Sequence, residues 1–388
     1  MNFNFLEPVS DVVLAHNELL SQQALGPKIR VHSKQNGIPD LEGVRVAILG
    51  VCENRNDINY IGDDLNFDEV RKCFYSLFPG NWFTEIADLG DIVQGNSIQD
   101  TYFALRTSVE SLLQQKIIPI ILGGGQDLTF SIYRAYDNVQ PMVNMVNVDS
   151  NFDLGDANQP IKNNSFFSKI ILEQPFNLFN YSAVGYQTYF NSQEEIDLMD
   201  RLFFEAYRLG EVSNDIHLVE PVMRDAHIVS IDLKSIKGSE VGAKQHYSPN
   251  GLDGKEICAI ARYAGISNKV SSFGIFEYKP NSDDALTPML MGQMMWYFVE
   301  GVNCRVSDDQ FNDENSYLKY NVMIENEELI FFKSTKTGRW WIEIPFLPNV
   351  NNKLKKHTLL PCTYDDYVQA SNGKIPERWY KAYKKNSF

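Results

Sequence analysis

The sequence has 388 residues, enough for one large domain or two average ones, and its 44% apolar and 22% charged residues are typical of a globular protein. A net charge of −15 argues against nucleic acid or an anionic membrane as partner, because both are bound by basic faces. The sequence lacks a signal peptide pattern, has no run of about 18 apolar residues and has five scattered cysteines without a CxxC pair. These features predict a cytoplasmic protein with reduced thiols.

The part of the sequence from residue 41 to residue 305 alternates between patterns typical of buried strands and of amphipathic helices. The predicted strands are Val44–Val51, Glu85–Leu89, Lys116–Leu122, Met142–Asp149, Tyr181–Tyr186, Ala226–Asp232 and Val270–Phe276. The predicted helices are Phe67–Phe78, Ile98–Gln115, Leu128–Tyr136, Phe166–Leu172, Gln193–Leu209, Leu218–Arg224, Gly254–Ala264 and Asp284–Glu300. Such an alternation indicates right-handed crossovers and a mainly parallel sheet. We predict an α/β fold of three layers, α/β/α.

The segments on either side of this domain have other patterns. Residues 1–40 contain one short amphipathic stretch, Val9–Leu20, and are expected to lie as an arm over the domain. Residues 306–388 are expected to form a C-terminal extension packed on the main domain. Its predicted elements are an acidic surface loop, the two strands of a hairpin and a short helix, at Ser307–Tyr317, Glu328–Ser334, Arg339–Phe346 and Tyr364–Ala370.

Polar residues follow several of the predicted strands. In chain order they are Gln126, Asp149, Asn151, Asp153, Asp232, Lys234 and Glu277. Because the carboxyl ends of parallel strands meet at one edge of a sheet, we expect these side chains to line one pocket. Several carboxylates in one pocket repel each other unless a cation lies among them, and Lys234, two residues after Asp232 and so on the same face of the strand, is an internal candidate.

The turn before Gln126 contains three consecutive glycines, Gly123–Gly125. A phosphate-binding loop would need the wider spacing G-x-G-x-x-G, so we predict that these glycines allow close backbone packing. Asp127 is in position to cap the helix that follows.

The segments GGGQD, DSNFD and SIDLK, in this order and with EYKP after the last strand, resemble the motifs of the ureohydrolases, the superfamily of arginase, agmatinase and formimidoylglutamase. The resemblance extends over roughly Val44 to Glu300, and the triple glycine is most similar to formimidoylglutamase. It implies an arginase-like fold and the hydrolysis of linear amidines. It also implies two manganese ions, held by two histidines and four aspartates, with a bridging hydroxide that attacks the amidino carbon.

Gln126 stands at the position of the first histidine in this resemblance. The D-x-H-x-D segment keeps Asp149 and Asp153 but has Asn151 in place of its histidine. Both imidazoles that the resemblance implies are therefore absent.

The last motif keeps Asp232 and has Lys234 where a second aspartate is expected. The segment at 163–167, NNSFF, lacks the histidine that is usual near the substrate loop of the relatives. Glu277 aligns with the acid that holds the cationic end of the substrate in the relatives, and it is the candidate substrate-binding residue.

These changes alter the charge balance of the pocket. The ammonium of Lys234 would lie where metal has to sit, so we expect it to replace the ions by pairing with a carboxylate. Its candidate partners are Asp149, Asp153 and Asp232. The amide oxygens of Gln126 and Asn151 suit magnesium or calcium better than manganese or zinc. We therefore expect no cofactor, a weak magnesium or calcium ion being the only metal that these donors favour.

The residues leave two main hypotheses open. In the first, the chain has lost the dinuclear manganese site and ureohydrolase activity, and acts as a small-molecule-binding or structural protein. In the second, it is an active C–N hydrolase of an amidino or formimino compound such as formimidoylglutamate, with an atypical metal site. A third, weaker hypothesis makes Lys234 a base or Schiff-base amine, which the surrounding aspartates oppose by raising its pKa. The expected partners are a small molecule and a second copy of the chain.

Overall fold

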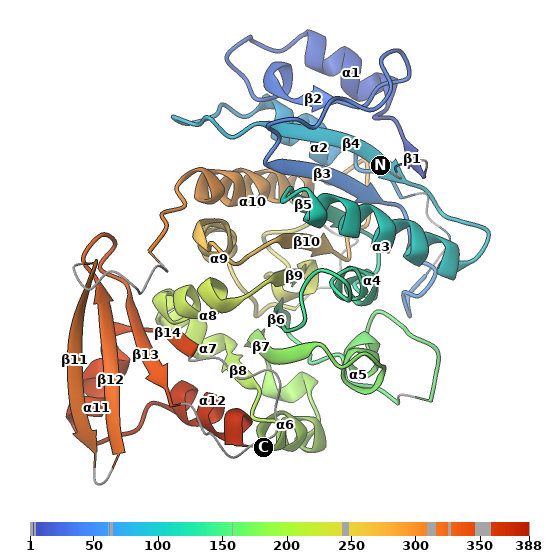
Figure 1. Cartoon of the computed structure of the whole chain (residues 1–388). Helices are drawn as coiled ribbons and strands as arrows, with labels where there is room; N and C mark the ends of the chain where they lie inside the picture. Colours follow the sequence, from blue (N-terminus) through green and yellow to red (C-terminus); the bar gives the residue numbers. More distant parts are fainter. Residues whose placement is uncertain are drawn as a thin grey trace.

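The computed structural model describes residues 3, 5–60, 62, 65–156, 158–242, 248–308, 316–324, 327–345 and 358–387. Its centre is a ten-stranded sheet with the strand order β1-β4-β3-β5-β10-β9-β6-β7-β8, in which β2 also pairs with β4 (Figure 1). All pairings in this sheet are parallel except that of β1 with β4. The strands are β1 (Leu6–Glu7), β2 (Arg30–Val31), β3 (Val46–Val51), β4 (Ile86–Ile92), β5 (Ile118–Gly123), β6 (Val143–Val148), β7 (Leu178–Tyr186), β8 (Glu205–Arg208), β9 (Ile228–Asp232) and β10 (Ser272–Phe276).

Helices cover both faces of this sheet (Figure 1). One face carries α1 (Asp11–Glu18), α2 (Asp68–Ser76), α8 (Val219–Asp225), α9 (Gly254–Ile266) and α10 (Leu286–Asn303). The other face carries α3 (Ile98–Gln114), α4 (Leu128–Arg134), α5 (Phe166–Leu172) and α6 (Gln193–Arg201). Ile120 and Leu122 of β5 belong to the first core and Ile121 to the second, because successive side chains of a strand point to opposite faces. The predicted three-layer α/β fold is confirmed.

One predicted helix, Gln193–Leu209, is wrong over its second half. The helix α6 ends at Arg201, Phe203 has a positive φ of 53°, and the chain then forms β8 and the short helix α7 (Leu209–Asn214). Strand β8 pairs with β7 at the edge of the sheet, so a tertiary pairing decides the structure of a segment whose local pattern was ambiguous.

The first forty residues join the sheet as well as covering it. Strand β1 pairs with β4 in the antiparallel direction, and β2 pairs with the same strand in the parallel direction. Helix α1 begins after the cap residue Ser10, whose hydroxyl accepts the backbone N–H of Val13, and it contacts α2.

The C-terminal extension contains a second, antiparallel sheet with the order β11-β12-β13-β14 (Figure 1). The predicted hairpin is confirmed as β12 (Glu327–Ser334) and β13 (Trp340–Ile344). The outer strands, β11 (Tyr317–Ile324) and β14 (Thr358–Cys362), were not predicted. The predicted helix is α11 (Tyr364–Ser371), and the tail after it forms α12 (Glu377–Ser387). Residues 309–315 of the predicted acidic loop lie outside the described residues.

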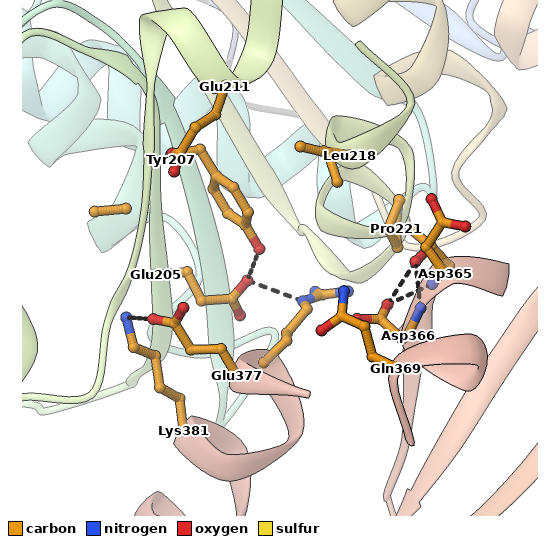
Figure 2. A pocket seen from close by; sticks show the side chains of 13 residues that line it. Glu205, Tyr207, Glu211, Leu218, Pro221, Asp365, Asp366, Gln369, Glu377 and Lys381 are labelled. Atoms are coloured by element: carbon orange, nitrogen blue, oxygen red, sulfur yellow. Dashed lines mark hydrogen bonds and ion pairs between the residues drawn. The ribbon is translucent and has the colours of Figure 1, made fainter. Parts of the chain in front are cut away.

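The extension is attached to the main sheet by buried charged groups (Figure 2). The guanidinium of Arg378 donates from Nε to Oε2 of Glu205 on β8, at 2.9 Å, and the hydroxyl of Tyr207 donates to the same carboxylate atom at 2.7 Å. On α8, Arg224 donates to the backbone oxygens of Trp340 and Cys362, at 3.0 and 3.1 Å. A cavity of about 370 Å³ remains between β8 and the helices α11 and α12. In the described part of the chain, no helix is long and apolar enough to cross a membrane.

Candidate functional site

The candidate site lies where four neighbouring strands end. Strands β5, β10, β9 and β6 are adjacent in the sheet and run in the same direction, so their carboxyl ends meet at one edge. Gln126, Glu277, Asp232 and Asp149 follow or end these strands in that order. The edge therefore brings together residues that are up to 151 positions apart, as in the 2.8 Å hydrogen bond from the Gln126 backbone N–H to Glu277 Oε1.

The glycine turn before Gln126 is packed too closely for side chains. A Cβ on Gly124 would lie 2.2 Å from the backbone oxygen of Glu53, and one on Gly123 would lie 2.3 Å from the ring of Phe276. This confirms close backbone packing as the reason for the glycines.

Asp127 occupies the cap position of α4, but its side chain makes no capping hydrogen bond, so that prediction is wrong. Its Oδ2 instead accepts hydrogen bonds from the Tyr102 hydroxyl and from Asn56 Nδ2, the latter at 3.1 Å. Burial raises the pKa of Asp127 to about 7. The carboxylate is thus part of the support beneath the turn.

Glu277 is held by three different residues. Its Oε1 accepts the backbone N–H of Gln126, both of its oxygens accept Asn163 Nδ2 at 3.0 Å, and Oε2 lies 2.6 Å from the ammonium of Lys234. Only 2% of the residue is exposed, and its backbone has a positive φ of 66°. A strained backbone angle at a buried carboxylate is a feature of functional sites, where the surrounding contacts maintain it.

Lys234 reaches this carboxylate from a short 3-10 turn, Leu233–Ser235, and not from the strand as predicted. Its Nζ is 2.6 Å from Glu277 Oε2 and 4.0 Å from Asp232 Oδ2. Of its three predicted partners only Asp232 is therefore within ion-pair distance, and the closest partner is Glu277. Burial alone would lower the pKa of Lys234, but the carboxylates of Asp232 and Glu277 outweigh burial and raise it. The amine is therefore charged at neutral pH.

Asp149, Asp153 and Asp232 are all buried in the pocket, and the pKa of each is raised. For Asp153 burial raises the pKa to about 7, with Asp232 adding to the effect. Burial also raises the pKa of Asp149 well above its usual range, and the nearby Asp153 carboxyl adds to it. The two carboxyls also affect each other, since Asp153 raises the pKa of Asp149 and Asp149 lowers that of Asp153, so they titrate as a pair.

The side chain of Gln126 lies beside the Asp149–Asp153 pair. In the orientation that satisfies both ends of its amide, Nε2 donates to Oδ2 of Asp149 at 2.9 Å and to Oδ2 of Asp153 at 3.0 Å. Asn151 does not join them, because its Nδ2 donates to the backbone oxygen of Phe190 at 3.2 Å. The structure thus brings all the predicted pocket residues together except the amide of Asn151.

Sequence reasoning missed the residues that surround Glu277. Asn163 bridges Glu277 and Asp57, to whose Oδ1 its Nδ2 donates at 3.0 Å, and Lys279 lies 2.9 Å from Asp57 Oδ2. The segment NNSFF contains Asn163 and the segment EYKP contains Lys279, so both lay beside recognised motifs. No pattern marked Asp57. His246, in the segment that follows the SIDLK motif, lies outside the described residues.

This arrangement defines a class of protein, α/β proteins with a polar site at the carboxyl edge of a parallel sheet, and comparison with known proteins identifies its family. The model of the arginase family matches residues 45–300, and the chain belongs to this family. Within the family it is close to formimidoylglutamase. The C-terminal extension lies beyond the matched residues.

Two relatives illustrate this closeness. The formimidoylglutamase of Geobacillus sp. (strain WCH70) is 24% identical over 230 residues, which cover 56% of this chain and 70% of the relative. The formimidoylglutamase of Lysinibacillus sphaericus is 23% identical over 271 residues, which cover 65% of this chain and 82% of the relative.

Solved structures share the fold. The crystal structure of Trypanosoma cruzi formiminoglutamase with Mn²⁺₂ has a TM-score of 0.61 at 18% identity, covering 69% of this chain and 96% of that protein. The crystal structure of formimidoylglutamase from Bacillus subtilis has a TM-score of 0.61 at 16% identity, covering 69% of this chain and 89% of that protein.

These comparisons contradict the prediction that no cofactor is expected. A neighbour with the same fold carries Mn²⁺₂, and the family and its solved members point to a dinuclear manganese site. The prediction was drawn from three altered positions alone, whereas 69% of the chain shares its fold with a protein whose structure contains Mn²⁺₂.

The donor set of this chain nevertheless differs from one that fits two manganese ions. Of the six positions at which the resemblance implies metal ligands, two carry neutral amides, Gln126 and Asn151, and the Asn151 side chain is turned away toward Phe190. A third position carries the ammonium of Lys234, which already pairs with Glu277. In the described ranges, no group of three or more His, Cys, Asp or Glu side chains is arranged to hold a metal ion. The three remaining aspartates are carboxylates, which are manganese ligands, but as placed they do not supply two coordination spheres.

Proposed function

We propose that this arginase-family protein does not carry out the two-metal hydrolysis of the family, and that it acts as a small-molecule-binding or structural protein related to formimidoylglutamase. One observation carries the proposal: the 2.6 Å ion pair between Lys234 and Glu277. By resemblance, Glu277 is the acid that holds the cationic end of the substrate. In this chain an internal cation already neutralises that acid.

The ion pair opposes the family's reaction in two ways. A cationic substrate has to compete with the Lys234 ammonium for Glu277, whose two oxygens are also hydrogen-bonded by Asn163 and the Gln126 backbone. The same ammonium is 4.0 Å from Asp232, so it repels a divalent cation that approaches this carboxylate. Both effects weaken the binding that catalysis depends on.

A second candidate function is an active C–N hydrolase with an atypical manganese site, acting on an amidino or formimino compound. It is favoured by the family membership, by the neighbour with Mn²⁺₂ and by the buried Asp149–Asp153 pair. Burial raises the pKa of both groups by disfavouring their charged forms, and a divalent cation between them would stabilise those charged forms. In this case Lys234, whose side chain is 23% exposed, would have to swing away from Glu277.

Activity assays separate the two functions. The full chain is incubated with manganese and a panel of guanidino and formimino compounds that includes formimidoylglutamate, and the release of formamide, urea and ammonia is measured. We expect no release above the protein-free blank for any compound or divalent ion. Release that depends on manganese and is lost in Asp149→Asn would contradict the proposal and establish the hydrolase.

The binding role is tested on the same panel without any turnover. Equilibrium titration of each compound reports whether the pocket takes a ligand. Lys234→Met, which frees Glu277 while keeping a long side chain, is expected to bind cationic compounds more tightly than the wild-type chain. If Lys234→Met bound none of them while the wild-type chain did, the ion pair would not be what limits access to Glu277.

A further inference from the structure

A polar cavity lies at the edge of the central sheet where the strands begin, opposite the carboxyl edge that carries the candidate site. Its volume is about 510 Å³, and its lining includes Ile118, His227 and Ser271, at the amino-terminal ends of β5, β9 and β10. The other ends of these same strands carry the candidate site. With about 3.3 Å per residue along a strand, the two sites are separated by roughly 15–20 Å.

The charges around this cavity are of one sign. Its charged lining residues are Arg45, Lys116, Lys269 and Arg305, and among the residues that the structure describes no Asp or Glu lines it. The chain as a whole has 50 acidic and 35 basic residues, so a lining whose charged residues are all basic is the opposite of its average composition. Like charges gathered around a concave surface raise the local concentration of anions.

Most of these cations lack a carboxylate partner. In the described part of the chain, Arg45, Lys116 and Arg305 form no ion pair, and only Lys269 has one, with Asp225 at 2.6 Å. The guanidinium of Arg305 is instead held by backbone oxygens: Nε donates to Gly265 and Nη2 to Val270, each at 2.8 Å. Burial lowers the pKa of Arg305 to about 9, and the charge of Arg45 adds to the shift. The group is fixed in place without a counter-ion.

A neutral donor completes the lining. His227 Nδ1 accepts the backbone N–H of Asn144 at 3.0 Å, so the proton of the neutral ring is on Nε2. Burial lowers the pKa of His227 to about 4, and Lys269 adds to the shift, so the ring is neutral at pH 7. The walls between these groups are apolar, formed in part by Leu113 and Val270.

We propose that this cavity binds a small anion with several negative charges, a phosphate compound or a polycarboxylate. Four convergent cations, three of them without an ion-pair partner among the described residues, together with a fixed guanidinium and a neutral N–H donor, are the groups that recognise such an anion. The volume suits a small molecule. A net charge of −15 disfavours a polyanionic macromolecule, because the rest of the surface repels it. The proposal is independent of the chemistry at the candidate site.

Calorimetric titration of the full chain tests this proposal. The probes are pyrophosphate and citrate, each at low salt, and the two arms distinguish a phosphate site from a polycarboxylate site. The test variant is Arg45→Gln with Lys116→Gln, since both side chains are exposed and neither has an ion-pair partner among the described residues. The matched control is Lys255→Gln with Lys374→Gln, which removes two exposed positive charges elsewhere.

We expect at least one probe to bind the wild-type chain, and the test variant to lose at least about tenfold in affinity, as expected for two charge-assisted contacts. The control should change the affinity by less than about twofold. An equal loss in the control would show a diffuse charge effect and overturn the proposal. It would also be overturned if neither probe bound, or if the chain bound RNA through these residues and neither small anion.

Discussion

Lys234 and Glu277 form the closest charged contact of the candidate site, with 2.6 Å between Nζ and Oε2. They are 43 positions apart and come from the ends of the neighbouring strands β9 and β10. The pair places a permanent positive charge beside Asp232, and it links the only cation of the predicted pocket to the acid that resemblance assigns to the substrate.

Removing one partner of this pair should destabilise the protein. In Glu277→Gln the Lys234 ammonium is left largely buried without its main counter-ion, and we expect a loss of about 2–4 kcal/mol in the free energy of unfolding. In Lys234→Met, which leaves Glu277 with its other hydrogen bonds, we expect a smaller loss of about 1–2 kcal/mol. Urea denaturation of both single variants and of the double variant measures the interaction free energy between the two side chains. Additive losses would show that the contact contributes nothing of its own.

Restoring the residue types of the family should raise the affinity for manganese. We expect the triple variant Gln126→His, Asn151→His and Lys234→Asp to bind manganese at least about a hundredfold more tightly than the wild-type chain, because it gains two imidazoles and replaces an ammonium by a carboxylate. Calorimetric titration with manganese measures this difference.

The three positions should not contribute equally. Asn151 is turned toward Phe190, so the double variant Gln126→His with Lys234→Asp is expected to give most of the gain. The control is Lys255→Asp, which changes an exposed charge by the same amount on α9. An affinity of the triple variant equal to that of the control would show that the altered side chains do not limit metal binding.

The position of the site could be predicted from the sequence, but its internal contacts could not. Buried β-branched runs that end in polar residues locate the carboxyl edge of a parallel sheet, and this placed Gln126, Asp149 and Asp232 together correctly. The partner of Lys234 depends on the 3-10 turn after β9 and on the positive φ of Glu277, which strand periodicity does not report. Asp57 could not be predicted either, because it lies in a loop without a recognisable motif and reaches the site only through its contacts with Asn163 and Lys279.

The errors in the fold also have a common physical cause. Strand β8 lies at an edge of the main sheet, and β11 and β14 lie at the two edges of the second sheet, so each is stabilised by pairing with a neighbouring strand on one side. Their local sequences do not separate strand from helix or loop, since β-propensity depends on the neighbouring strand. The buried central strands, β3, β5 and β9, have continuous apolar runs and were predicted to within about two residues, the usual uncertainty of element ends.

The raised pKa of Asp153 predicts a pH-dependent stability. Its pKa is about 7 in the folded protein and 3.8 for an unperturbed aspartate, as in the unfolded chain, so the folded state binds more protons between these pH values. The stability that this proton supplies is fully present below about pH 4 and is lost as the pH rises through 7. Relative to the wild-type chain, Asp153→Asn should therefore be more stable at pH 8 than at pH 5, by about 1–3 kcal/mol.

Denaturation in metal-free buffer at both pH values measures this difference. Asparagine tolerates the positive φ of 53° at this position at least as well as aspartate, so the backbone is not a complication. The control is Asp283→Asn, at an exposed position. If Asp153→Asn and the control had the same pH dependence, Asp153 would not hold a proton in the folded protein.

The attachment of the C-terminal extension depends on the buried contact between Arg378 and Glu205. Arg378→Met leaves the Glu205 carboxylate buried with only neutral donors and Lys385 nearby, and we expect a loss of about 3–5 kcal/mol in the free energy of unfolding. Because Arg378 belongs to α12 and Glu205 to β8, the loss should include loosening of the extension from the main sheet.

Limited proteolysis separates this loosening from general unfolding. In Arg378→Met we expect cleavage within residues 306–388 at a rate that rises before the main domain unfolds, because the extension opens locally. Lys374→Met, at an exposed position between α11 and α12, is the matched control and should be cleaved like the wild-type chain. Glu205→Gln with Arg378→Met should recover part of the lost stability, since it removes the unpaired charge. A double variant no more stable than Arg378→Met would show that packing of the guanidinium, and not its charge, holds the extension on β8.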